Sequence, residues 1–457
     1  MSEGRAAPLP VRSAMPGVVW PGIARGEDAA VLALLAQLQH AEYSSPQSLR
    51  EHQDRQLRAL CAHARGEVPF YRERLKMLGR ALDLSRWHEV PILERAELQQ
   101  IGPALRASRY PPEHGKTRLI TTSGSTGMTV AIEKTAVCGL IASACILREH
   151  LWHARDFNGR LAAVRMVKDD PQAMTLPGRH VRGWGAGTTQ LEQQGEGFLL
   201  DIHVPLGDQW QWLESIAPDY VLTYPSNLRA WLDLPQAARG LASLRHVKTI
   251  GELVEPELRA RCRAVLGVPL IDEYSAQECG SIAIQCPRHD HYHVQAESVL
   301  VEVVDESGQA CAPGSIGRVV VTPLHEFRTP LIRYALGDYA ELGPACDCGR
   351  ALPVLKRVWG RARNMITLPD GSKRWPLSGD SHYRAIAPIS QFQFVQRTPT
   401  HFEVRLVVRR ELTTDEETRF KAWVMQRFGY PFELDLVYME RIERGAGGKY
   451  EDFISHL

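Results

Sequence analysis

Long apolar runs are scarce in this 457-residue sequence, and their scarcity argues against a membrane protein. The most apolar stretch extends only from Ala136 to Leu147, and Gly139 and Ser143 interrupt it. A membrane-spanning helix needs about 20 apolar residues. The N-terminal region also lacks the continuous apolar segment of a secretory signal. We therefore expect a cytoplasmic protein with no membrane partner.

An excess of charge of either sign is also missing. The chain holds 54 Lys and Arg residues against 53 Asp and Glu residues, which gives a formal net charge of +1. A nucleic-acid-binding surface needs a basic excess on one face, so we expect no nucleic-acid partner. A hydrophobic content of 44% and a charged content of 23% are typical of a globular protein. The length predicts two or three domains.

A regular disulfide framework is absent, because the nine cysteines are odd in number and mostly scattered. Cys286, however, precedes His289, His291 and His293, and Cys346 and Cys348 follow later. Three thiolates and one imidazole would form a closed, structural zinc site. His289 has the commoner Cys-x₂-His spacing, and all three histidines remain candidates. The alternative is a set of reduced cysteines beside a histidine-rich turn.

Strand and helix patterns alternate along the middle of the chain, which predicts an α/β core with parallel strands. The expected strands are 161–167, 220–223, 246–250, 269–271, 299–304 and 317–323, and the expected helical stretches include 28–66, 227–232 and 255–266. After Arg361, strands at 391–395, 402–408 and 432–437 and a helix at 415–428 predict a small α+β domain. We expect a flexible lead at 1–26, a large domain at 27–361 and a small domain at 362–457.

One segment carries four hydroxyl side chains around two glycines: Thr122, Ser123, Gly124, Ser125, Thr126 and Gly127. Glycines let backbone N–H groups approach an anion closely, and hydroxyls donate to phosphate oxygens. The segment is not a Walker A loop, because Met128 follows the second glycine and 129–133 has the pattern of a strand. We interpret it as a phosphate-binding loop between two strands. A solvated glycine- and serine-rich hairpin is the alternative.

Several further segments, in the right order, resemble the phenylacetate–CoA ligase branch of the adenylate-forming superfamily. The resemblance covers about residue 69 to the last residue. Residues 274–278 resemble the family's Tyr-Gly-x-Thr/Ser-Glu segment, and residues 333–338 resemble its Arg-Tyr-x-x-Gly-Asp segment. The other matching segments are 68–72, Gly251-Glu252, Asp272-Glu273, Gly360-Arg361 and Gly448-Lys449. This agreement predicts a large N-terminal α/β adenylate-forming domain with a small mobile C-terminal α+β domain.

The resemblance implies a site for Mg²⁺ and ATP. The hydroxyl-rich loop would hold the β- and γ-phosphates, Tyr274 would stack on adenine, and Asp338 would accept both ribose hydroxyls. Glu278 would bind Mg²⁺, and Lys449 would bridge the attacking carboxylate and the α-phosphate. Two anions meet in that reaction, so cations must offset their repulsion. Further nucleotide-binding residues implied are Gly251, Glu252, Glu273 and Arg361, and the acyl pocket is expected at Tyr224, Pro225, Ser226 and Ser275.

The sequence departs from the family pattern at a few positions. Met128 stands where the wider superfamily has lysine, Gln277 replaces Thr or Ser, and Ser275 replaces Gly. Arg363-Asn364 replace two aspartates at the hinge. These departures put one phosphate contact, the width of the acyl pocket and the hinge chemistry in doubt.

The resemblance extends to zinc. Some members of this branch carry a Cys…His pair together with Cys-x-Cys-Gly, which Cys346 to Gly349 resembles. Within that pattern the ligands would be Cys286, His293, Cys346 and Cys348.

The predicted function is ATP-dependent activation of a carboxylic acid, aryl or arylacetic, to an acyl-AMP, followed by transfer to coenzyme A. The small domain would rotate about residues 361–364 between the two steps. An amine acceptor and a carrier-protein thiol are alternatives, and a nucleotide-binding protein that has lost catalysis is another. The oligomeric state is open, with a homodimer as one option.

Overall fold

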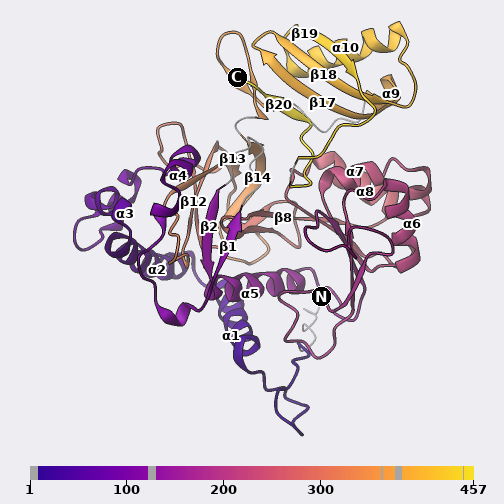
Figure 1. Cartoon of the computed structure of the whole chain (residues 1–457). Helices are drawn as coiled ribbons and strands as arrows, with labels where there is room; N and C mark the ends of the chain where they lie inside the picture. Colours follow the sequence, from indigo (N-terminus) through magenta and orange to yellow (C-terminus); the bar gives the residue numbers. More distant parts are fainter. Residues whose placement is uncertain (1–8, 122–129, 362–363, 376–382, 446) are drawn as a thin grey trace.

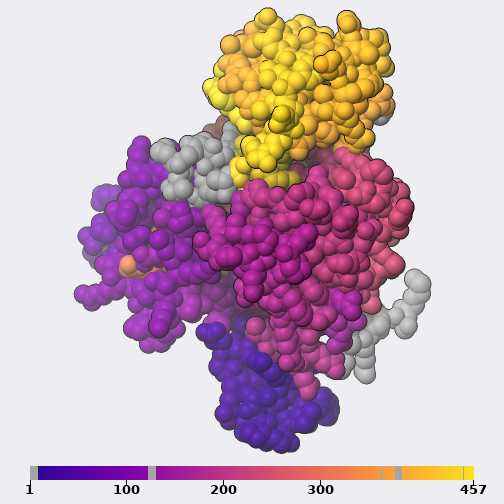
Figure 2. Space-filling view, turned by 45° about the vertical axis from the view of Figure 1, so that its right-hand side comes forward, coloured from indigo at the N-terminus to yellow at the C-terminus, as the bar shows by residue number. Residues whose placement is uncertain are grey.

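The computed structural model describes residues 9–121, 130–361, 364–375, 383–445 and 447–457 (Figure 1). A large α/β unit carries a smaller α+β unit, drawn at the top of the figure. The space-filling view shows the small unit, in yellow, seated on the magenta part of the large one (Figure 2). This architecture confirms the predicted fold class.

Helices form the N-terminal part of the large unit. They are α1 (Gly26–Ala41), α2 (Pro46–Glu67), α3 (Pro69–Arg74) and α4 (Arg95–Ile101), joined by 3₁₀ turns at Lys76–Leu78, Leu84–Glu89, Gly102–Leu105 and Pro112–His114. The continuous helical stretch expected at 28–66 is wrong in one respect, because the chain breaks before Pro46. Ser45 caps α2 there by accepting a hydrogen bond from the Ser48 N–H.

The residues before α1 contact the large unit from Leu9 onward. Val11 forms an isolated β-bridge with Leu191, and the Arg12 N–H donates to the Gln190 carbonyl. Arg12 also pairs with Asp28 in α1 at 2.9 Å. These contacts tie the described part of the lead to the body of the large unit.

The centre of the large unit is a 12-stranded sheet in the order β11-β12-β13-β14-β10-β9-β8-β7-β6-β3-β5-β4. Strands β5, β3, β6, β7 and β8 are parallel. The strands on this side are β3 (Leu161–Arg165), β4 (Arg179–Arg182), β5 (Glu196–Asp201), β6 (Tyr220–Thr223), β7 (His246–Ile250) and β8 (Leu270–Ala276). β8 runs further than the expected 269–271, and its extension carries Tyr274.

The rest of the sheet is antiparallel. Its strands are β9 (Gly280–Gln285), β10 (Tyr292–Val294), β11 (Val299–Val304), β12 (Ile316–Pro323), β13 (Tyr334–Leu342) and β14 (Val354–Arg361). A separate hairpin, β1 (Thr117–Thr121) and β2 (Ala131–Thr135), pairs Thr121 with Ala131. Residues 122–129, which include the expected phosphate loop, lie outside the described residues.

Helices cover the parallel strands, and an apolar core fills the space between. They are α5 (Ala136–Trp152), α6 (Leu206–Ile216), α7 (Pro225–Trp231) and α8 (Pro256–Leu266), with a 3₁₀ turn at Pro235–Arg239. Trp210, Leu213 and Trp231 are buried between α6, α7 and the strands. No helix of the described chain has both the length and the apolarity required to cross a bilayer.

The small unit has its own sheet, in the order β19-β18-β17-β20. Its elements are β15 (Ile366–Thr367), β16 (Lys373–Arg374), α9 (Tyr383–Ile386), β17 (Ile389–Thr398), β18 (His401–Val408), α10 (Thr414–Phe428), β19 (Glu433–Tyr438) and β20 (Phe453–Ser455). Phe394, Phe402, Phe420 and Phe428 are buried together between α10 and the sheet. Strand β20 pairs in parallel with β17, which returns the chain to the junction with the large unit.

Candidate active site

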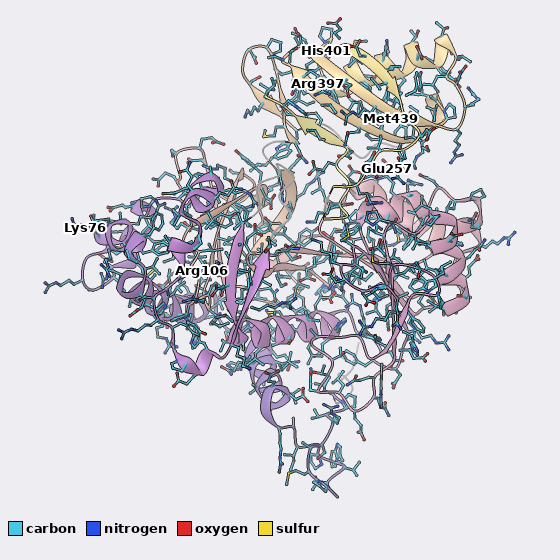
Figure 3. The ribbon with its side chains drawn as sticks, viewed as in Figure 1. Lys76, Arg106, Glu257, Arg397, His401 and Met439 are labelled. Atoms are coloured by element: carbon cyan, nitrogen blue, oxygen red, sulfur yellow. The ribbon has the colours of Figure 1, made fainter. Side chains whose placement is uncertain are left out.

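A cavity of about 460 Å³ lies where the parallel strands end and the small unit meets the large one. Its wall includes the ends of β7, β8, β13 and β14 and the segment before β20. Figure 3 labels Glu257 of α8 and Met439, which follows β19, on the two sides of this junction. Ligands of parallel α/β sheets bind at the carboxyl ends of the strands, so this position suits an active site.

Lys449 reaches this cavity on a loop that the large unit holds in place. The Tyr224 hydroxyl donates to the Gly447 carbonyl at 3.3 Å, and the Tyr450 N–H donates to Glu252 Oε1 at 2.7 Å. Arg444 donates to Ser226 Oγ at 2.8 Å and lies 3.7 Å from Glu252. Tyr224, Ser226 and Glu252, which we expected to hold substrate or nucleotide, thus contact the lysine loop in this structure.

The end of β7 leaves room for the lysine. Gly251 has a φ of +78°, which is strained for any other residue. A Cβ built on it would lie 3.0 Å from Lys449 Cε and 3.4 Å from Nζ. Burial, and then the nearby Arg361, lower the pKa of Lys449. Within the described chain its ammonium has no ion-pair partner, so the cation is available to an anionic ligand.

Asp338 lies on the opposite wall, in the hydrogen-bonded pair of strands β13 and β14. Its carboxylate accepts a hydrogen bond from Tyr274 at 2.8 Å and lies 3.5 Å from Arg361 Nε. Asp338 and Arg361 are register partners, which explains their closeness. Burial, and then Asp338, raise the pKa of Tyr274, so the phenol stays protonated and donates. A carboxylate, a ring and a guanidinium therefore meet at one place, as a nucleoside site requires.

Glu278 pairs with an arginine that no sequence pattern predicted. Arg95, at the start of α4, contacts its Oε1 at 2.9 Å. Glu278 is buried, and its Oε2 has no hydrogen-bond partner in the described chain. Mg²⁺ binds one or two carboxylates and completes its shell with water and phosphate oxygens, so one free carboxylate oxygen beside the cavity fits it.

An alternating set of charges extends from the cavity into the interior. Glu273 Oε2 lies 2.7 Å from Lys248 Nζ, which also lies 3.1 Å from Glu149 Oε2. Arg155 binds both oxygens of Glu149, at 2.6 and 2.7 Å. Lys248, Glu149 and Arg155 were not expected from the sequence, because single charged residues in a strand or helix carry no signal of pairing.

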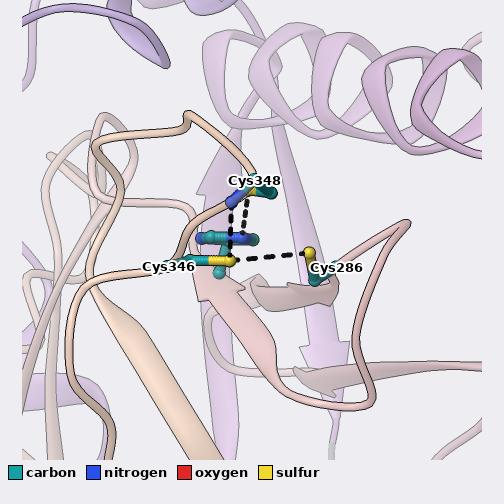
Figure 4. Close-up of side chains that lie close together, drawn as sticks. Cys286, Cys346 and Cys348 are labelled. Atoms are coloured by element: carbon teal, nitrogen blue, oxygen red, sulfur yellow. Dashed lines mark hydrogen bonds between the residues drawn. The ribbon is translucent and has the colours of Figure 1, made fainter.

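A second cluster lies apart from the cavity, where Cys286, Cys346 and Cys348 converge with His293 (Figure 4). Their ligand atoms all lie within 4.8 Å of one another. Cys286 and Cys346 are 3.9 Å apart at sulfur, and Cys348 Sγ lies 3.3 Å from His293 Nε2. Tetrahedral zinc with bonds of about 2.3 Å would place neighbouring sulfurs about 3.8 Å apart. The donor set therefore fits zinc in type and spacing.

The surroundings of His293 suit a metal ligand. Its Nδ1 lies 3.4 Å from the Leu352 carbonyl, which leaves Nε2 directed at the thiols. Burial lowers the pKa of His293 to about 4, so the imidazole is neutral near pH 7. His289 instead groups with Cys346 and Asp347, and His291 Nε2 lies 3.1 Å from Cys346 Sγ. Of the three candidate histidines, His293 is the one that joins all three thiols.

Comparison with known proteins identifies the family of the chain. The model of the AMP-binding enzyme family matches residues 52–325, and the CapK C-terminal domain model matches residues 380–456. The chain belongs to the AMP-binding enzyme family. It is 26% identical to a phenylacetate-coenzyme A ligase of Thermus thermophilus over 396 residues, which are 81% of this chain and 80% of that protein. It is 25% identical to a phenylacetate-coenzyme A ligase of Pseudomonas putida over 73% of this chain and 75% of that protein.

Solved structures agree on the fold of this AMP-binding enzyme. A crystal structure of 2-hydroxyisobutyryl-CoA ligase in the postadenylation state matches with a TM-score of 0.72 at 17% identity, over 91% of both chains. An anthranilate CoA ligase in complex with anthranoyl-AMP matches with a TM-score of 0.53 at 14% identity, over 72% of this chain and 65% of that one. At these identities the likeness describes architecture alone.

The structure of this AMP-binding enzyme brings most expected site residues together. The cavity is lined by Tyr224, Ser226, Gly251, Glu252, Glu273, Tyr274, Ser275, Glu278, Asp338, Arg361 and Lys449. Pro225 is buried at the first turn of α7 and does not line the cavity, because a proline there serves the helix start. Thr122 to Gly127, Met128 and Arg363 lie outside the described residues. Gln277 and Asn364, two of the departures, line the cavity.

Proposed function

We propose that this chain joins a carboxylic acid to AMP at the expense of ATP and then transfers the acyl group to the thiol of coenzyme A. In the first step a carboxylate oxygen attacks the α-phosphorus, and pyrophosphate leaves. In the second step the thiolate attacks the acyl carbon, and AMP leaves. The observation that carries the proposal is Lys449, which has no ion-pair partner among the described residues and lines the same cavity as the hydrogen-bonded Tyr274–Asp338 pair.

Different residues would have different roles in the first step, the formation of acyl-AMP. Asp338 would accept the ribose hydroxyls, with Tyr274 holding its orientation, because a carboxylate matches a diol well. Lys449 would lie between the attacking carboxylate and the α-phosphate, where its charge lowers their repulsion. The hydroxyl-rich loop at 122–127 would hold the outer phosphates. Glu278 would hold Mg²⁺, which supplies further neutralising charge when bound.

The second step needs the lysine loop to leave. In the structure that loop occupies the space between Tyr224, Ser226 and Glu252, so a thiol cannot reach the acyl carbon from that side. We infer a rotation of the small domain, residues 362–457, about residues 361–364 against the large domain, residues 27–361. Such a rotation concentrates its backbone change in a few residues.

We also propose that Cys286, His293, Cys346 and Cys348 hold a structural zinc ion. Cys286 follows β9, His293 lies in β10, and Cys346 and Cys348 precede β14, so a bound ion would tie two loops to β10 at the end of these paired strands. None of the four donors lines the cavity, so the ion would have no part in the transfer.

Pyrophosphate release with ATP and a panel of aryl, arylacetic and aliphatic acids, without any acceptor, tests the first step. Release with at least one acid is expected. Coenzyme A, amines or a carrier-protein thiol are then added, and product mass identifies the acceptor.

Lys449→Ala is the matching variant, expected to lower acyl-AMP formation by about 10³-fold while ATP still binds. Lys76→Ala, at an exposed position on the surface, is the control and should have no effect. Equal loss of binding and adenylation in Lys449→Ala would show a structural lysine instead.

A further inference from the structure

Glu273 is held in an unusual way for a residue in a cavity wall. It lies on β8, and its Oε2 is bound by Lys248 from the neighbouring strand β7. Lys248 is bound in turn by Glu149 from α5, which Arg155 clamps on both oxygens. Although burial acts against it, Arg155 and then Lys248 hold the pKa of Glu149 well below its usual range. The chain of charges therefore holds Glu273 Oε2 against Lys248.

Glu273 is the member of this set that reaches the cavity within the described chain. Its side chain is 12% exposed, and its Oε1 has no hydrogen-bond partner among the described contacts. A carboxylate oxygen can accept two hydrogen bonds. Among the described residues, the cavity wall therefore presents a carboxylate oxygen that can still accept hydrogen bonds.

The charges around Glu273 limit the kind of ligand group that can donate a hydrogen bond to its Oε1. Two carboxylates, Glu149 and Glu273, match two cations, Lys248 and Arg155. Burial lowers the pKa of His150 and of His153 to about 3 and that of His246 to about 4, so these neighbouring imidazoles are neutral near pH 7. The set is already neutral, and a neutral donor satisfies Oε1 without adding a charge to a buried place.

The position of Glu273 points to the acyl group and not to the nucleotide. Successive strand residues face opposite sides of a sheet, and Tyr274 contacts Asp338. Glu273 is the register partner of Ile250, the residue before Gly251, against which Lys449 lies. Neighbouring strands are about 4.8 Å apart, so Glu273 enters the cavity wall beside the strand end at which Lys449 lies.

We propose that Glu273 is a specificity-determining residue, and that the acid activated by this enzyme carries a neutral hydrogen-bond donor, a hydroxyl or an aromatic amine, on its acyl portion. This inference rests on the proposed function, and it reassigns Glu273 from the nucleotide to the acyl pocket. An acid with a bare ring would bury Oε1 without a partner, which is the kind of loss that discriminates strongly between analogues.

The test compares benzoate and phenylacetate with their hydroxyl and amino derivatives at each ring position, by pyrophosphate release. For the wild-type chain, kcat/KM for the best donor-bearing acid should exceed that of its parent by about 10²-fold or more. The double variant Glu273→Leu with Lys248→Met removes both partners and leaves Glu149 with Arg155. It should lose that preference while keeping the KM for ATP. Glu273→Gln, which keeps the shape and one acceptor oxygen, should give an intermediate preference.

Three results would overturn the inference. One is a wild-type preference for the unsubstituted acids, and a second is equal use of all members of a pair. The third is a Glu273→Gln variant that raises the KM for ATP equally with every acid, since that would return Glu273 to the nucleotide. If none of the acids in the panel caused pyrophosphate release, the proposed function would be rejected, and this inference with it.

Discussion

Lys449 occupies the space that a side chain at residue 251 would fill. A Cβ there would lie 3.0 Å from Lys449 Cε, and the positive φ of Gly251 disfavours any other residue. The loop after β7 and the lysine loop of the small unit therefore fit together only because residue 251 is glycine. This contact is one of several by which the large unit and the small unit enclose the candidate site.

Gly251→Ala should displace Lys449 and lower acyl-AMP formation by about 10-fold or more, because small misplacements of a reacting group are costly. Backbone strain should also cost about 1–2 kcal/mol of stability. Gly267→Ala is the matched control, since Gly267 has a similar φ of +73° but no atom within 4 Å of a built Cβ. Pyrophosphate release and thermal melting measure the two effects. Equal loss of activity in both variants would contradict the contact argument.

Arg444→Ala should affect the two half-reactions unequally. Arg444 contacts Ser226 and Glu252 only while the lysine loop is inserted, so its loss should slow acyl-AMP formation by about 10-fold. Transfer from supplied acyl-AMP to coenzyme A should stay within about twofold of wild type, because that step needs the loop withdrawn. Arg441→Ala, at an exposed position in the same segment, should change neither rate. Parallel loss of both half-reactions would show a general structural role.

The pH dependence of acyl-AMP formation should report Lys449. Burial lowers its pKa below the ordinary lysine value of 10.5, so the ammonium loses its proton at a lower pH than an exposed lysine does. The cation is the active form, and kcat/KM should therefore fall on the alkaline side, with a midpoint below 10.5. Lys449→Arg keeps the charge at high pH and should remove this fall, although its different geometry lowers the rate. An unchanged alkaline limb in that variant would assign the limb to another group.

Purified protein should contain about one zinc ion per chain. Cys346→Ser with Cys348→Ser should remove the ion and lower the melting temperature by several degrees, since metal binding adds to folding stability. Cys311→Ser, a thiol outside the cluster, should keep the metal. Elemental analysis and melting curves measure both. Metal-free wild-type protein that melts no lower than metal-loaded protein would end the zinc proposal.

The residues that could be predicted from the sequence are those whose role only one or two residue types can fill. Gly251, Tyr274 and Asp338 stand in short motifs that resemble those of the family, and the structure places all three in the wall of one cavity. The spacing of the thiols and histidines indicated a cluster, but only the family resemblance favoured His293 over His289 and His291.

Contacts between residues far apart in the sequence could not be predicted. Arg95 and Glu278 are 183 residues apart, and Arg444 and Ser226 are 218 apart. No periodicity connects residues at such separations, and each alone has the pattern of an exposed polar residue. The break before Pro46 was missed for a different reason, since the apolar spacing of α1 and α2 continues across it.

The contacts of Glu252 with the lysine loop affect the proposed opening of the site. It is a buried carboxylate shared between Ser226 at the start of α7 and Tyr450 of the inserted segment, and burial raises its pKa. The proposed withdrawal of that segment would take the Tyr450 N–H away from Glu252 and would leave Arg444 without Ser226 and Glu252, so water would have to replace these contacts. On the proposed mechanism, opening the site therefore carries a hydration cost that the closed arrangement avoids.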